Sequence, residues 1–308
     1  MQFQENYWQK LESTIKSPFI MSAIEVCAGV VTYNPDLDVL KNNLESLCPQ
    51  VKFLYVVDNG SKNVDEIGTL LNTIPNTQLY LNGDNLGIAQ ALNRLCGIAE
   101  KNGFHWILTM DQDSLCDPMM VENLCMYVNE EYGIIAPRIE FRNAGVLIES
   151  TGTDCGKDFE EIYACITSGS LTNIEAWKAA GGFDEWYFID HVDNEFCTHI
   201  IQKGLKVIRV NKALLHQRAG DMKYISLFGK PIMLPYYSTF RNYYICRNTI
   251  YYIRKYWRDI NLYKEVRSFV YSQTIKMLFE KGRWANFKSS VKGIWDGACK
   301  KIEFIDYS

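Results

Sequence analysis

The feature of this sequence that most limits its fold is a series of short apolar runs separated by amphipathic segments. The run VCAGVVTY, at residues 26–33, is apolar almost throughout, which is typical of a strand covered on both faces. The following segment, 36–48, has leucines at helical spacing, and the run FLYVVDN at 53–59 is apolar again. Such repetition of strand and helix predicts an α/β fold with a Rossmann-like, mostly parallel sheet.

The same pattern continues along the first two-thirds of the chain and then changes. The remaining elements expected in that part are helices and strands at 64–73, 77–82, 87–101, 105–111, 173–182 and 192–203, short strands with turns between 133 and 172, and a final strand at 205–210. From residue 236 onward the pattern becomes that of three aromatic, amphipathic helices. We therefore expect a domain at 1–235 followed by a C-terminal helical segment at 236–308.

Charge is distributed unevenly between these two parts. Residues 236–308 contain 14 Lys and Arg against 6 Asp and Glu, whereas residues 1–235 contain 18 against 30. A basic, aromatic tail on an acidic body indicates an anionic partner. The tail either lies in a membrane interface or packs on the body as a helical subdomain. No nucleic-acid-binding motif is present, so nucleic acid is not expected, and pairing of tails in a homodimer stays open.

The cysteines and the apolar content indicate the compartment. The ten cysteines form no CxxC pair and several lie in apolar stretches, so we expect reduced thiols and no structural zinc. The first twenty residues are mixed and polar, and no run of about 18 uncharged apolar residues occurs. We therefore expect a cytoplasmic protein without a membrane-spanning segment.

The sharpest chemical signal is MDQDS at 110–114, at the end of an apolar run. Ligands of open α/β sheets bind outside the carboxyl ends of the strands. Two carboxylates at i and i+2 there, Asp111 and Asp113, suit Mg²⁺ or Mn²⁺, because these cations prefer oxygen ligands and leave positions open for phosphates. The competing interpretation of these two acids alone is a solvated turn.

Two weaker signals follow other apolar runs. Asp58 ends the run at 53–59, where a carboxylate can accept from a base N–H, although a plain exit into a turn explains it equally well. Gly87 opens a predicted helix, and helix N-termini favour phosphate. Asn85 can instead be the cap of that helix, and the residues alone favour this capping interpretation.

The segment WYFIDHVDNEFC, at 186–197, gathers acids at the start of a predicted helix. Asp190 and Asp193 are three residues apart, so both can face one cleft, and either can supply the general base that a sugar hydroxyl needs. The competing interpretation is that these acids only stabilise the N-terminus of the helix. His216 follows the last apolar run and can complete a metal site, although a single histidine more often has a packing role.

In their order and context, these motifs resemble the family-2 glycosyltransferases with the GT-A fold, and more narrowly their bacterial rhamnosyltransferase-like branch. The resemblance extends from about Val26 to about Tyr252. The motifs that carry it are VVTYNP, VVDNGS, NLGIAQALN, MDQDS, TSGSLTNIEAWKAAGGFDEWYFIDHVDNEF and LLHQRAG.

The resemblance implies a role for each matching residue. The residues that it places along the nucleotide sugar are Thr32, Tyr33, Asp58, Gly87, Asn93, Asp111, Ser168, Gly169 and Arg247. It implies that Asp111 and Asp113 fill the DxD position and, with His216, hold Mg²⁺ or Mn²⁺. It implies Asp193 as the catalytic base, with Asp190 as the rival because spacing in this loop varies within the family.

The activity that the resemblance implies is metal-dependent transfer of a sugar with inversion. The expected donor is dTDP-L-rhamnose, with a UDP-hexose or UDP-galactofuranose as the alternative. The expected acceptor is a glycan or a polyprenyl-diphosphate-linked glycan of surface polysaccharide synthesis, at the inner face of the plasma membrane. A nucleotidyltransferase is disfavoured because TYNPDLD replaces the glycine-rich basic loop that would follow its first strand. A sugar-nucleotide-binding scaffold is disfavoured by the intact set of acids.

Overall fold

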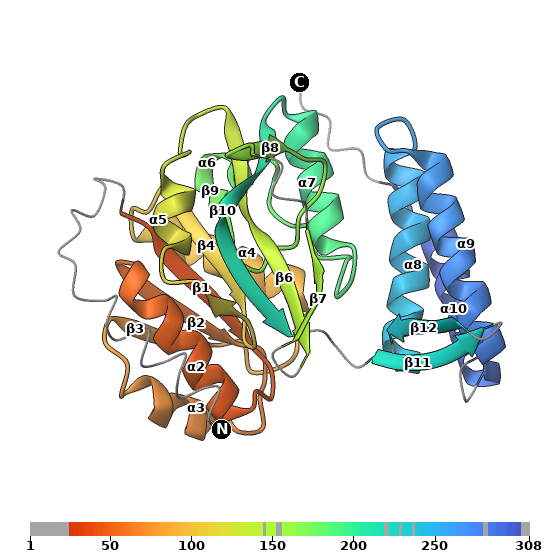
Figure 1. The fold of residues 1–308 in the computed structure, drawn as a ribbon, viewed down its shortest axis with the longest axis horizontal. Coiled ribbons are helices and arrows are strands. Elements are labelled where there is room, and N and C mark those ends of the chain that lie inside the picture. The colour runs from red at the N-terminus through yellow and green to blue at the C-terminus, as the bar shows by residue number, and fades with distance from the viewer. Residues whose placement is uncertain are drawn as a thin grey trace.

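The computed structural model describes residues 25–143, 146–151, 156–218, 222–227, 230–235, 238–279 and 283–302 (Figure 1). The N-terminal elements are β1 (Cys27–Thr32), α2 (Leu37–Leu47), the short helix η1 (Cys48–Gln50), β2 (Phe53–Asp58), α3 (Val64–Leu71), β3 (Thr77–Leu81), α4 (Ile88–Lys101) and β4 (Trp106–Asp111). The central elements are β5 (Leu115–Cys116), α5 (Met120–Cys125), β6 (Tyr132–Asn143), β7 (Val146–Ser150), β8 (Phe159–Glu161), β9 (Ser170–Asn173), α6 (Ile174–Ala179), α7 (Val192–Gln202) and β10 (Lys206–Arg218). The C-terminal elements are β11 (Met222–Leu227), β12 (Lys230–Pro235), α8 (Thr239–Tyr256), α9 (Leu262–Phe279) and α10 (Arg283–Cys299).

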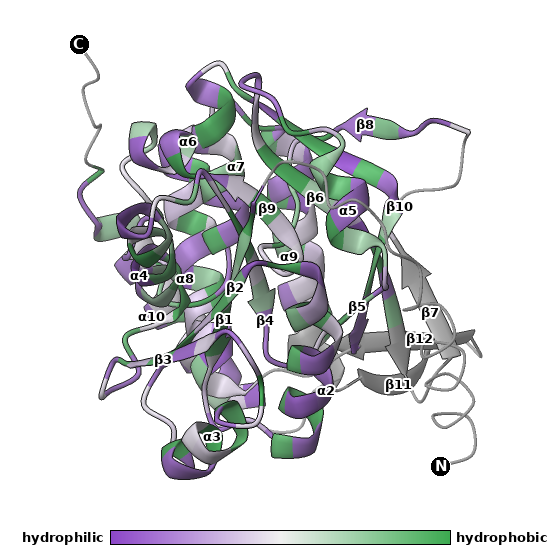
Figure 2. Cartoon of the chain, turned by 90° about the vertical axis from the view of Figure 1, so that its left-hand side faces the viewer, coloured by the Kyte–Doolittle hydropathy of each residue, from purple (hydrophilic) through white to green (hydrophobic). Residues whose placement is uncertain are grey.

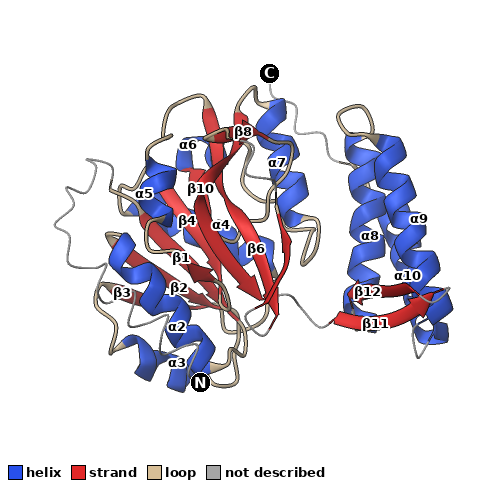
Figure 3. Ribbon diagram, viewed as in Figure 1, coloured by secondary structure: helices blue, strands red, loops and turns tan. Residues whose placement is uncertain are grey.

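One large sheet organises the described part of the chain (Figure 3). Its strands follow the order β3-β2-β1-β4-β9-β6-β10-β5, and β7 and β8 pair with β6 and β10. The strands β3, β2, β1 and β4 are parallel. Strand β9 is antiparallel to both β4 and β6, so β6 and its parallel neighbour β10 point the same way as β4. The predicted α/β fold with a mostly parallel sheet is confirmed, and the carboxyl ends of six strands, β3, β2, β1, β4, β6 and β10, point to one edge.

The sheet is covered on both faces because its central strand is apolar on both faces. Ala28 and Val30 of β1 pack in one core with residues of α2 and α3, whereas Cys27 and Val31 pack in a second core with residues of α4 and α7. Alternate residues of a strand point to opposite faces, so a continuous apolar run is what this sandwich requires. Figure 2 shows α2 and α4 in mixed bands of hydrophobic and hydrophilic residues, as expected for helices with one face on a sheet.

Three expectations about the elements need correction. Strand β6 is twelve residues long, where only short strands were expected between 133 and 172. Strand β10 continues to Arg218 instead of ending at residue 210, and it contains a register shift between Val210 and Leu214 that lets it run on beyond the apolar stretch. It is also not the final strand, because β11 and β12 form a separate two-stranded sheet.

Three further expectations concern the cysteines, a membrane-spanning helix and the boundary of the C-terminal segment. The described cysteines are free, and Cys155 lies outside the described residues. Within the described ranges, no helix is long and apolar enough to cross a membrane. The boundary at residue 235 stays a prediction, and α8 begins shortly after it, at Thr239.

Helix α8 is bonded to α7 through buried polar groups. Glu195 of α7, which is 1% exposed, accepts from Lys255 Nζ at 2.9 Å and from the Tyr256 hydroxyl at 2.6 Å. The hydroxyls of Thr198 and Tyr252 lie 2.7 Å apart. Buried hydrogen bonds of this kind hold two elements in one relative position. The first helix of the C-terminal segment is therefore continuous with the core of the sheet domain.

Helix α10 packs on α8 through small and polar residues. Its buried positions are Asn286, Ser290, Gly293 and Gly297. Asn242 of α8 donates to Ser290 Oγ at 2.8 Å and to the carbonyl of Asn286 at 3.3 Å. A Cβ at Gly297 would overlap the carbonyl oxygen of Arg247, so the two helix backbones approach as closely as glycine allows.

Substitution of two helical glycines by alanine should have opposite effects on stability. In a helix interior alanine is favoured over glycine by about 1 kcal/mol, and a Cβ at Gly97 of α4 meets nothing within 4 Å. We expect Gly97→Ala to raise the free energy of unfolding by about 0.5–1 kcal/mol. We expect Gly297→Ala to lower it by about 1–3 kcal/mol, because α10 must move away from α8. Chemical denaturation measures both, and equal stabilisation by both variants would contradict the packing described.

Acid should destabilise the protein through His191, at the junction of α7 and α8. Its Nε2 lies 2.8 Å from the Thr249 hydroxyl, and burial lowers its pKa from 6.5 to about 4, against the opposing charge of Asp190. The fold thus prefers the neutral ring. This contribution is present above pH 6.5 and is lost as the pH falls from 6.5 towards 4, by on the order of 2 kcal/mol.

The measurement is the midpoint of urea unfolding between pH 7.5 and pH 5. We expect His191→Asn to weaken the pH dependence, since asparagine tolerates the same left-handed backbone and does not titrate. His199, whose pKa burial also lowers to about 4, should account for the pH dependence that remains in this variant. The control is His105→Asn at an exposed position, and an identical pH dependence in all three proteins would refute the assignment.

Candidate active site

Three polar residues end neighbouring parallel strands of the sheet. Thr32 ends β1, Asp58 ends β2 and Asp111 ends β4. In the pairing register Thr32 lies opposite Asp58, and Val31 lies opposite Asp111. Their side chains therefore meet at the carboxyl edge, where open α/β sheets bind ligands.

Asp58 is enclosed at this edge, with 2% of its surface exposed. Its Oδ1 accepts from the Thr32 hydroxyl at 3.0 Å, and its Oδ2 accepts from the amides of Gly60 at 3.0 Å and Ser61 at 2.8 Å. Charge-assisted bonds from three donors fix the direction of the carboxylate. The neighbouring Tyr33 is 47% exposed, so this corner of the edge combines a fixed acid with an open aromatic ring.

The backbone of Tyr33 is tied to the acidic turn after β4. Its amide donates to Gln112 Oε1 at 2.8 Å, and Gln112 Nε2 donates back to its carbonyl at 3.3 Å. Gln112 stands between Asp111 and Asp113 in the chain, so this pair holds the two predicted motifs side by side. The sequence analysis did not identify Gln112, and its place between the two aspartates is the signal that could have found it.

Gly87 starts α4 in a backbone conformation that suits glycine, with φ at 87°. A Cβ there would lie 2.6 Å from the ring of Phe188, so the loop before α7 rests directly on this glycine. The Gly87 amide donates to Asn85 Oδ1 at 3.1 Å, and the Ile88 amide donates to the Phe188 carbonyl at 2.8 Å. The capping interpretation of Asn85 is wrong, because Gly87 is the cap residue of α4 and no side chain caps the helix. Asn85 instead bonds within the turn before the helix, and the Phe188 carbonyl satisfies the first amide of α4.

The two aspartates of the DxD position carry like charges in a partly enclosed turn. The pKa of Asp111 rises to about 6 because of burial and the charge of Asp113, while Arg241 opposes the rise. Partial shielding from water also raises the pKa of Asp113, against the charge of Arg218. Gln217 Nε2 donates to Asp111 Oδ2 at 3.2 Å. A pair of acids whose ionised forms are disfavoured in this way is a favourable site for a cation.

The two candidate bases have different surroundings. Asp193, in the first turn of α7, has a pKa raised to about 7 by burial and by the charges of Asp111 and Asp190, and the Thr167 side chain bonds to it. Asp190 instead accepts from Arg241 at three contacts of 2.9 to 3.2 Å. A bidentate guanidinium neutralises its partner and fixes it in place. The carboxylate that faces other acids without such a partner is therefore Asp193.

His216 does not join the two aspartates in a common site. Its Nδ1 lies 3.3 Å from Glu140 Oε2, across the pairing of β10 with β6. Among the residues that the structure describes, no three His, Cys, Asp or Glu side chains are grouped so as to hold a metal ion. The predicted trio of Asp111, Asp113 and His216 is thus not brought together, because the register of β10 directs His216 towards Glu140.

Ser168 and Gly169 lie beside the acidic edge, where they hold the end of β4. Ser168 is 1% exposed, its hydroxyl accepts from the Asp111 amide at 3.1 Å, and it lies 3.0 Å from the Ser114 hydroxyl. Gly169 has φ at 77°, and a Cβ there would lie 2.9 Å from the side chain of Leu215. Their predicted contact with a sugar stays a prediction.

Asn93 and Arg247 bind the chain itself. Asn93 Oδ1 accepts from the amide of Phe183 at 2.8 Å and from the Trp177 ring nitrogen at 3.0 Å. Arg247 is 7% exposed, donates to the carbonyl of Trp186 and lies 4.3 Å above that indole ring. Both side chains contact the segment that leads into α7, and their predicted contact with the nucleotide sugar stays a prediction.

Arg241 is the charged residue that the sequence analysis missed. It lies in α8, beyond the expected end of the catalytic domain, and it is 2.9 Å from Asp190. The basic run FRNYYICRN belongs to the C-terminal helical segment, for which both membrane contact and packing on the body were left open. The available signal was the continuation of the family resemblance to about Tyr252, which includes this run.

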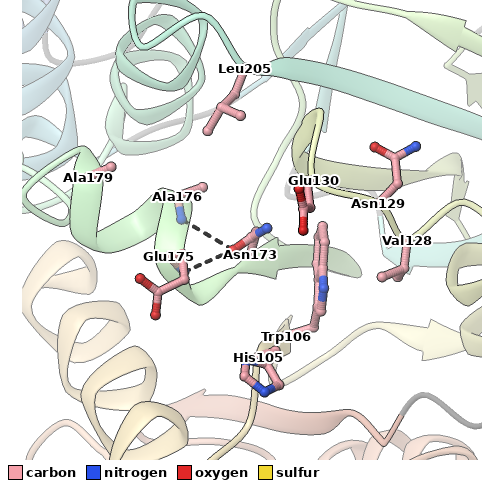
Figure 4. Close-up of a pocket in the computed structure, with 10 residues that line it drawn as sticks. All are labelled: His105, Trp106, Val128, Asn129, Glu130, Asn173, Glu175, Ala176, Ala179 and Leu205. Carbon is pink, nitrogen blue, oxygen red and sulfur yellow. Dashed lines mark hydrogen bonds between the residues drawn. The ribbon is translucent and has the colours of Figure 1, made fainter.

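A well-formed cavity lies elsewhere in the molecule. It has a volume of about 520 Å³ and is bordered by His105 and Trp106 at the start of β4 and by Asn173 at the end of β9 (Figure 4). Asn173 Oδ1 accepts there from the amides of Glu175 and Ala176, which caps α6. Five residues of β4 separate this edge from Asp111, or about 17 Å of strand. The cavity therefore belongs to the amino edge of the sheet and not to the acidic site.

Comparison with known proteins agrees with this geometry. Residues 27–166 match the model of "Glycosyl transferase family 2". The chain is 27% identical over 288 residues to "dTDP-rhamnosyl transferase RfbF" of Shigella flexneri, covering 88% of this chain and 95% of the relative. The matched range contains β1, β2 and β4, which carry Thr32, Asp58 and Asp111.

Solved structures share the fold at low sequence identity. The structure of GalNAc-T7 with UDP, GalNAc and Mn²⁺ matches with a TM-score of 0.58 and 13% identity over 91% of this chain, which spans 56% of that protein. Residues 1–349 of S. aureus TarS, in complex with UDP-GlcNAc, match with a TM-score of 0.57 and 14% identity over 89% of this chain and 80% of the other. The chain has the GT-A fold, matches glycosyltransferase family 2 over residues 27–166, and is similar in sequence to a rhamnosyltransferase.

Proposed function

We propose that this glycosyltransferase transfers L-rhamnose from dTDP-L-rhamnose to a hydroxyl group, with inversion, and that Asp193 is the catalytic base. The observation that carries the assignment of the base is the contrast between two acids of one loop. Asp190 is neutralised by Arg241, whereas Asp193 lies among other acids with its pKa raised to about 7. A base is most effective when its pKa lies near the working pH.

In this mechanism the residues of the chain bind, orient and move a proton. Asp58 and Thr32 receive the base of the nucleotide at the end of β1 and β2, and Tyr33 covers it from the exposed side. Asp193 takes the proton of the acceptor hydroxyl, whose oxygen then attacks the anomeric carbon from the face opposite the nucleotide. The bond from the anomeric carbon to the nucleoside diphosphate breaks as the new bond forms, and the nucleoside diphosphate leaves. The configuration is therefore inverted without a covalent enzyme intermediate.

The DxD pair fits a divalent cation. Asp111 and Asp113 offer the oxygen ligands that Mg²⁺ and Mn²⁺ prefer. Burial raises the pKa of both, and the charge of Asp113 raises that of Asp111 further, so a cation would relieve an unfavourable state of both ionised groups. A metal ion held there would neutralise negative charge on the leaving diphosphate. GalNAc-T7, which shares the fold, was solved with Mn²⁺, and this supports the proposal.

The donor is proposed from the named relative. RfbF of Shigella flexneri is described as a dTDP-rhamnosyl transferase, and the similarity extends over 95% of its length. A UDP-sugar is the second candidate, because TarS was solved with UDP-GlcNAc. The acceptor is proposed to be a glycan or a polyprenyl-diphosphate-linked glycan of bacterial surface polysaccharide, used on the cytoplasmic side of the membrane.

Replacement of the base should abolish transfer but leave the donor bound. We expect Asp193→Asn to lower kcat by about 10²–10⁴-fold, because the isosteric amide cannot accept the proton. Nucleotide release from dTDP-rhamnose, UDP-glucose, UDP-galactose, UDP-galactofuranose and GDP-mannose, with Mg²⁺ or Mn²⁺ and with chelator, measures the rate, and calorimetry measures donor binding.

The matched control is Asp65→Asn, at an exposed position in α3, which should keep the wild-type rate. Wild-type kcat in Asp193→Asn would overturn the assignment of the base. Turnover that is strongest with a UDP-sugar would replace the proposed donor, and undiminished turnover after complete metal removal would remove the proposed role of the DxD pair.

We also propose that the C-terminal helices contact an anionic membrane surface. Helix α10 carries its apolar residues outward: Trp284, Phe287, Val291, Ile294 and Trp295 are between 37% and 72% exposed. Its inward positions are small or polar, which reverses the usual amphipathic arrangement. The lysines Lys288 and Lys292 lie within this exposed face. Aromatic and aliphatic side chains beside lysines suit the interface of anionic lipid, whereas a second copy of the same face would add repulsion between like charges.

Removal of the two outward indoles should weaken membrane binding. We expect the variant Trp284→Ser with Trp295→Ser to lose most flotation with vesicles of phosphatidylcholine and phosphatidylglycerol. Tyr163→Ser, which removes an aromatic ring that is 86% exposed in another part of the molecule, should float like the wild type. Failure of the wild type to float with anionic vesicles would contradict the proposal. A dimer in light scattering that the double variant abolishes would also contradict it, and would favour a protein interface at this face.

A further inference from the structure

The two residues before α7 have a left-handed backbone conformation, which residues other than glycine rarely adopt. Asp190 has φ at 65° and His191 has φ at 63°. Residues other than glycine are sterically crowded in this left-handed region, and two such residues in succession are uncommon. A strained pair of this kind persists only when the surrounding structure holds it, so the contacts of this turn identify the group on which its shape depends.

Asn248, in the middle of α8, is the side chain that bonds to the backbone of this turn. It is 0% exposed, and its Nδ2 donates to the carbonyl of Ile189 at 2.7 Å and to the carbonyl of Asp190 at 2.9 Å. Its Oδ1 accepts from Arg247 Nε at 2.8 Å. The amide is thus oriented at both ends, and one of its nitrogens binds the two successive carbonyls that the left-handed turn directs towards α8.

The turn sets the position of the candidate base. Helix α7 begins at Val192, directly after His191, and Asp193 is its second residue. The first backbone bond of the helix runs from the Glu195 amide to the His191 carbonyl at 3.0 Å. A rotation at residue 190 or 191 would therefore turn the first turn of α7, and with it the Asp193 carboxylate, relative to Asp111 at the end of β4.

Other groups of α8 bind this loop through its side chains or further from the turn. Arg241 binds the carboxylate of Asp190, Thr249 binds the ring of His191, and Arg247 binds the carbonyl of Trp186. Asn248 is the member of this set that is placed on the backbone of the strained residues. Its loss would leave two carbonyls without that donor and would release the turn towards ordinary backbone angles.

We propose that Asn248 is a positioning residue for catalysis, which holds the left-handed pair Asp190–His191 so that Asp193 faces the acceptor hydroxyl. This inference rests on the proposed function of Asp193 as the base. Asn248 itself touches neither donor nor acceptor in this scheme, so its removal should lower kcat and leave the affinity for the nucleotide, bound at β1 and β2, unchanged.

The test compares two buried asparagines of the same helix. Asn248→Ala should lower kcat by at least about tenfold, with a change in donor KM of less than about twofold. Asn242→Ala is the matched control, since Asn242 is 2% exposed and donates to α10 instead of the loop. It should lose stability but keep the wild-type kcat when rates are normalised to the fraction that binds nucleotide. Equal losses of kcat in both variants, or none in either, would overturn the proposal.

A second arm distinguishes positioning from general destabilisation. Glycine adopts positive φ without strain, so His191→Gly in the Asn248→Ala background should recover at least about threefold of the lost kcat, although it removes a further side chain. Absence of recovery would also overturn the proposal. Asn248→Ser, which keeps one donor, should have an intermediate kcat, and it replaces Asn248→Ala if that protein does not fold.

Asp193→Asn in the same assay separates this inference from the proposed function. If Asp193→Asn is inactive while Asn248→Ala has the wild-type kcat, the positioning role alone is wrong. If Asp193→Asn keeps the wild-type kcat, the base is misassigned, and the proposed function fails together with the inference that rests on it.

Discussion

The parallel register of β1 with β2 and β4 is the constraint on which the site depends. It brings Thr32, Asp58 and Asp111 to one edge, although these residues are far apart in the chain. The register is fixed because alternate residues of β1 belong to two different cores, so a shift by one residue would exchange buried faces. The same packing that stabilises the sheet therefore aligns the groups that are proposed to receive a nucleotide sugar.

Acidic side chains are concentrated at this edge, and their ionised forms are less favourable there than in water. Asp111, Asp113 and Asp193 all have raised pKa values, and loss of water is the largest cause in each case. Arg241 and Arg218 moderate this charge from outside the acidic turn. An edge of this kind suits a cation and a group that donates a proton. The proposed metal-assisted transfer to a hydroxyl group involves one of each.

Local pattern was enough to predict much of this arrangement. Continuous apolar runs indicated buried strands, and polar residues at their ends indicated the carboxyl edge, so Asp58 and Asp111 were placed correctly with respect to the sheet. The acids before α7 were also identified, but their local sequence left two candidate bases open. What distinguishes them is Arg241, 51 residues from Asp190 in the chain, and no periodicity links such distant positions.

Other roles depend on register and packing that one sequence does not specify. His216 meets Glu140 because of a shift in the pairing of β10 with β6, and the apolar pattern of β10 contains no sign of that shift. Asn93 and Arg247 have residue types suited to polar ligands, yet they bind the backbone near Phe183 and Trp186.

Asn248 is separated from Ile189 by 59 residues, so the contact between them forms only after α8 has been synthesised. On the proposed role of Asn248, a nascent chain that ends before α8 contains β1, β2 and β4 but lacks the side chain that holds the turn before Asp193. In this order of synthesis, the proposed base can be held in place only after α8 has left the ribosome.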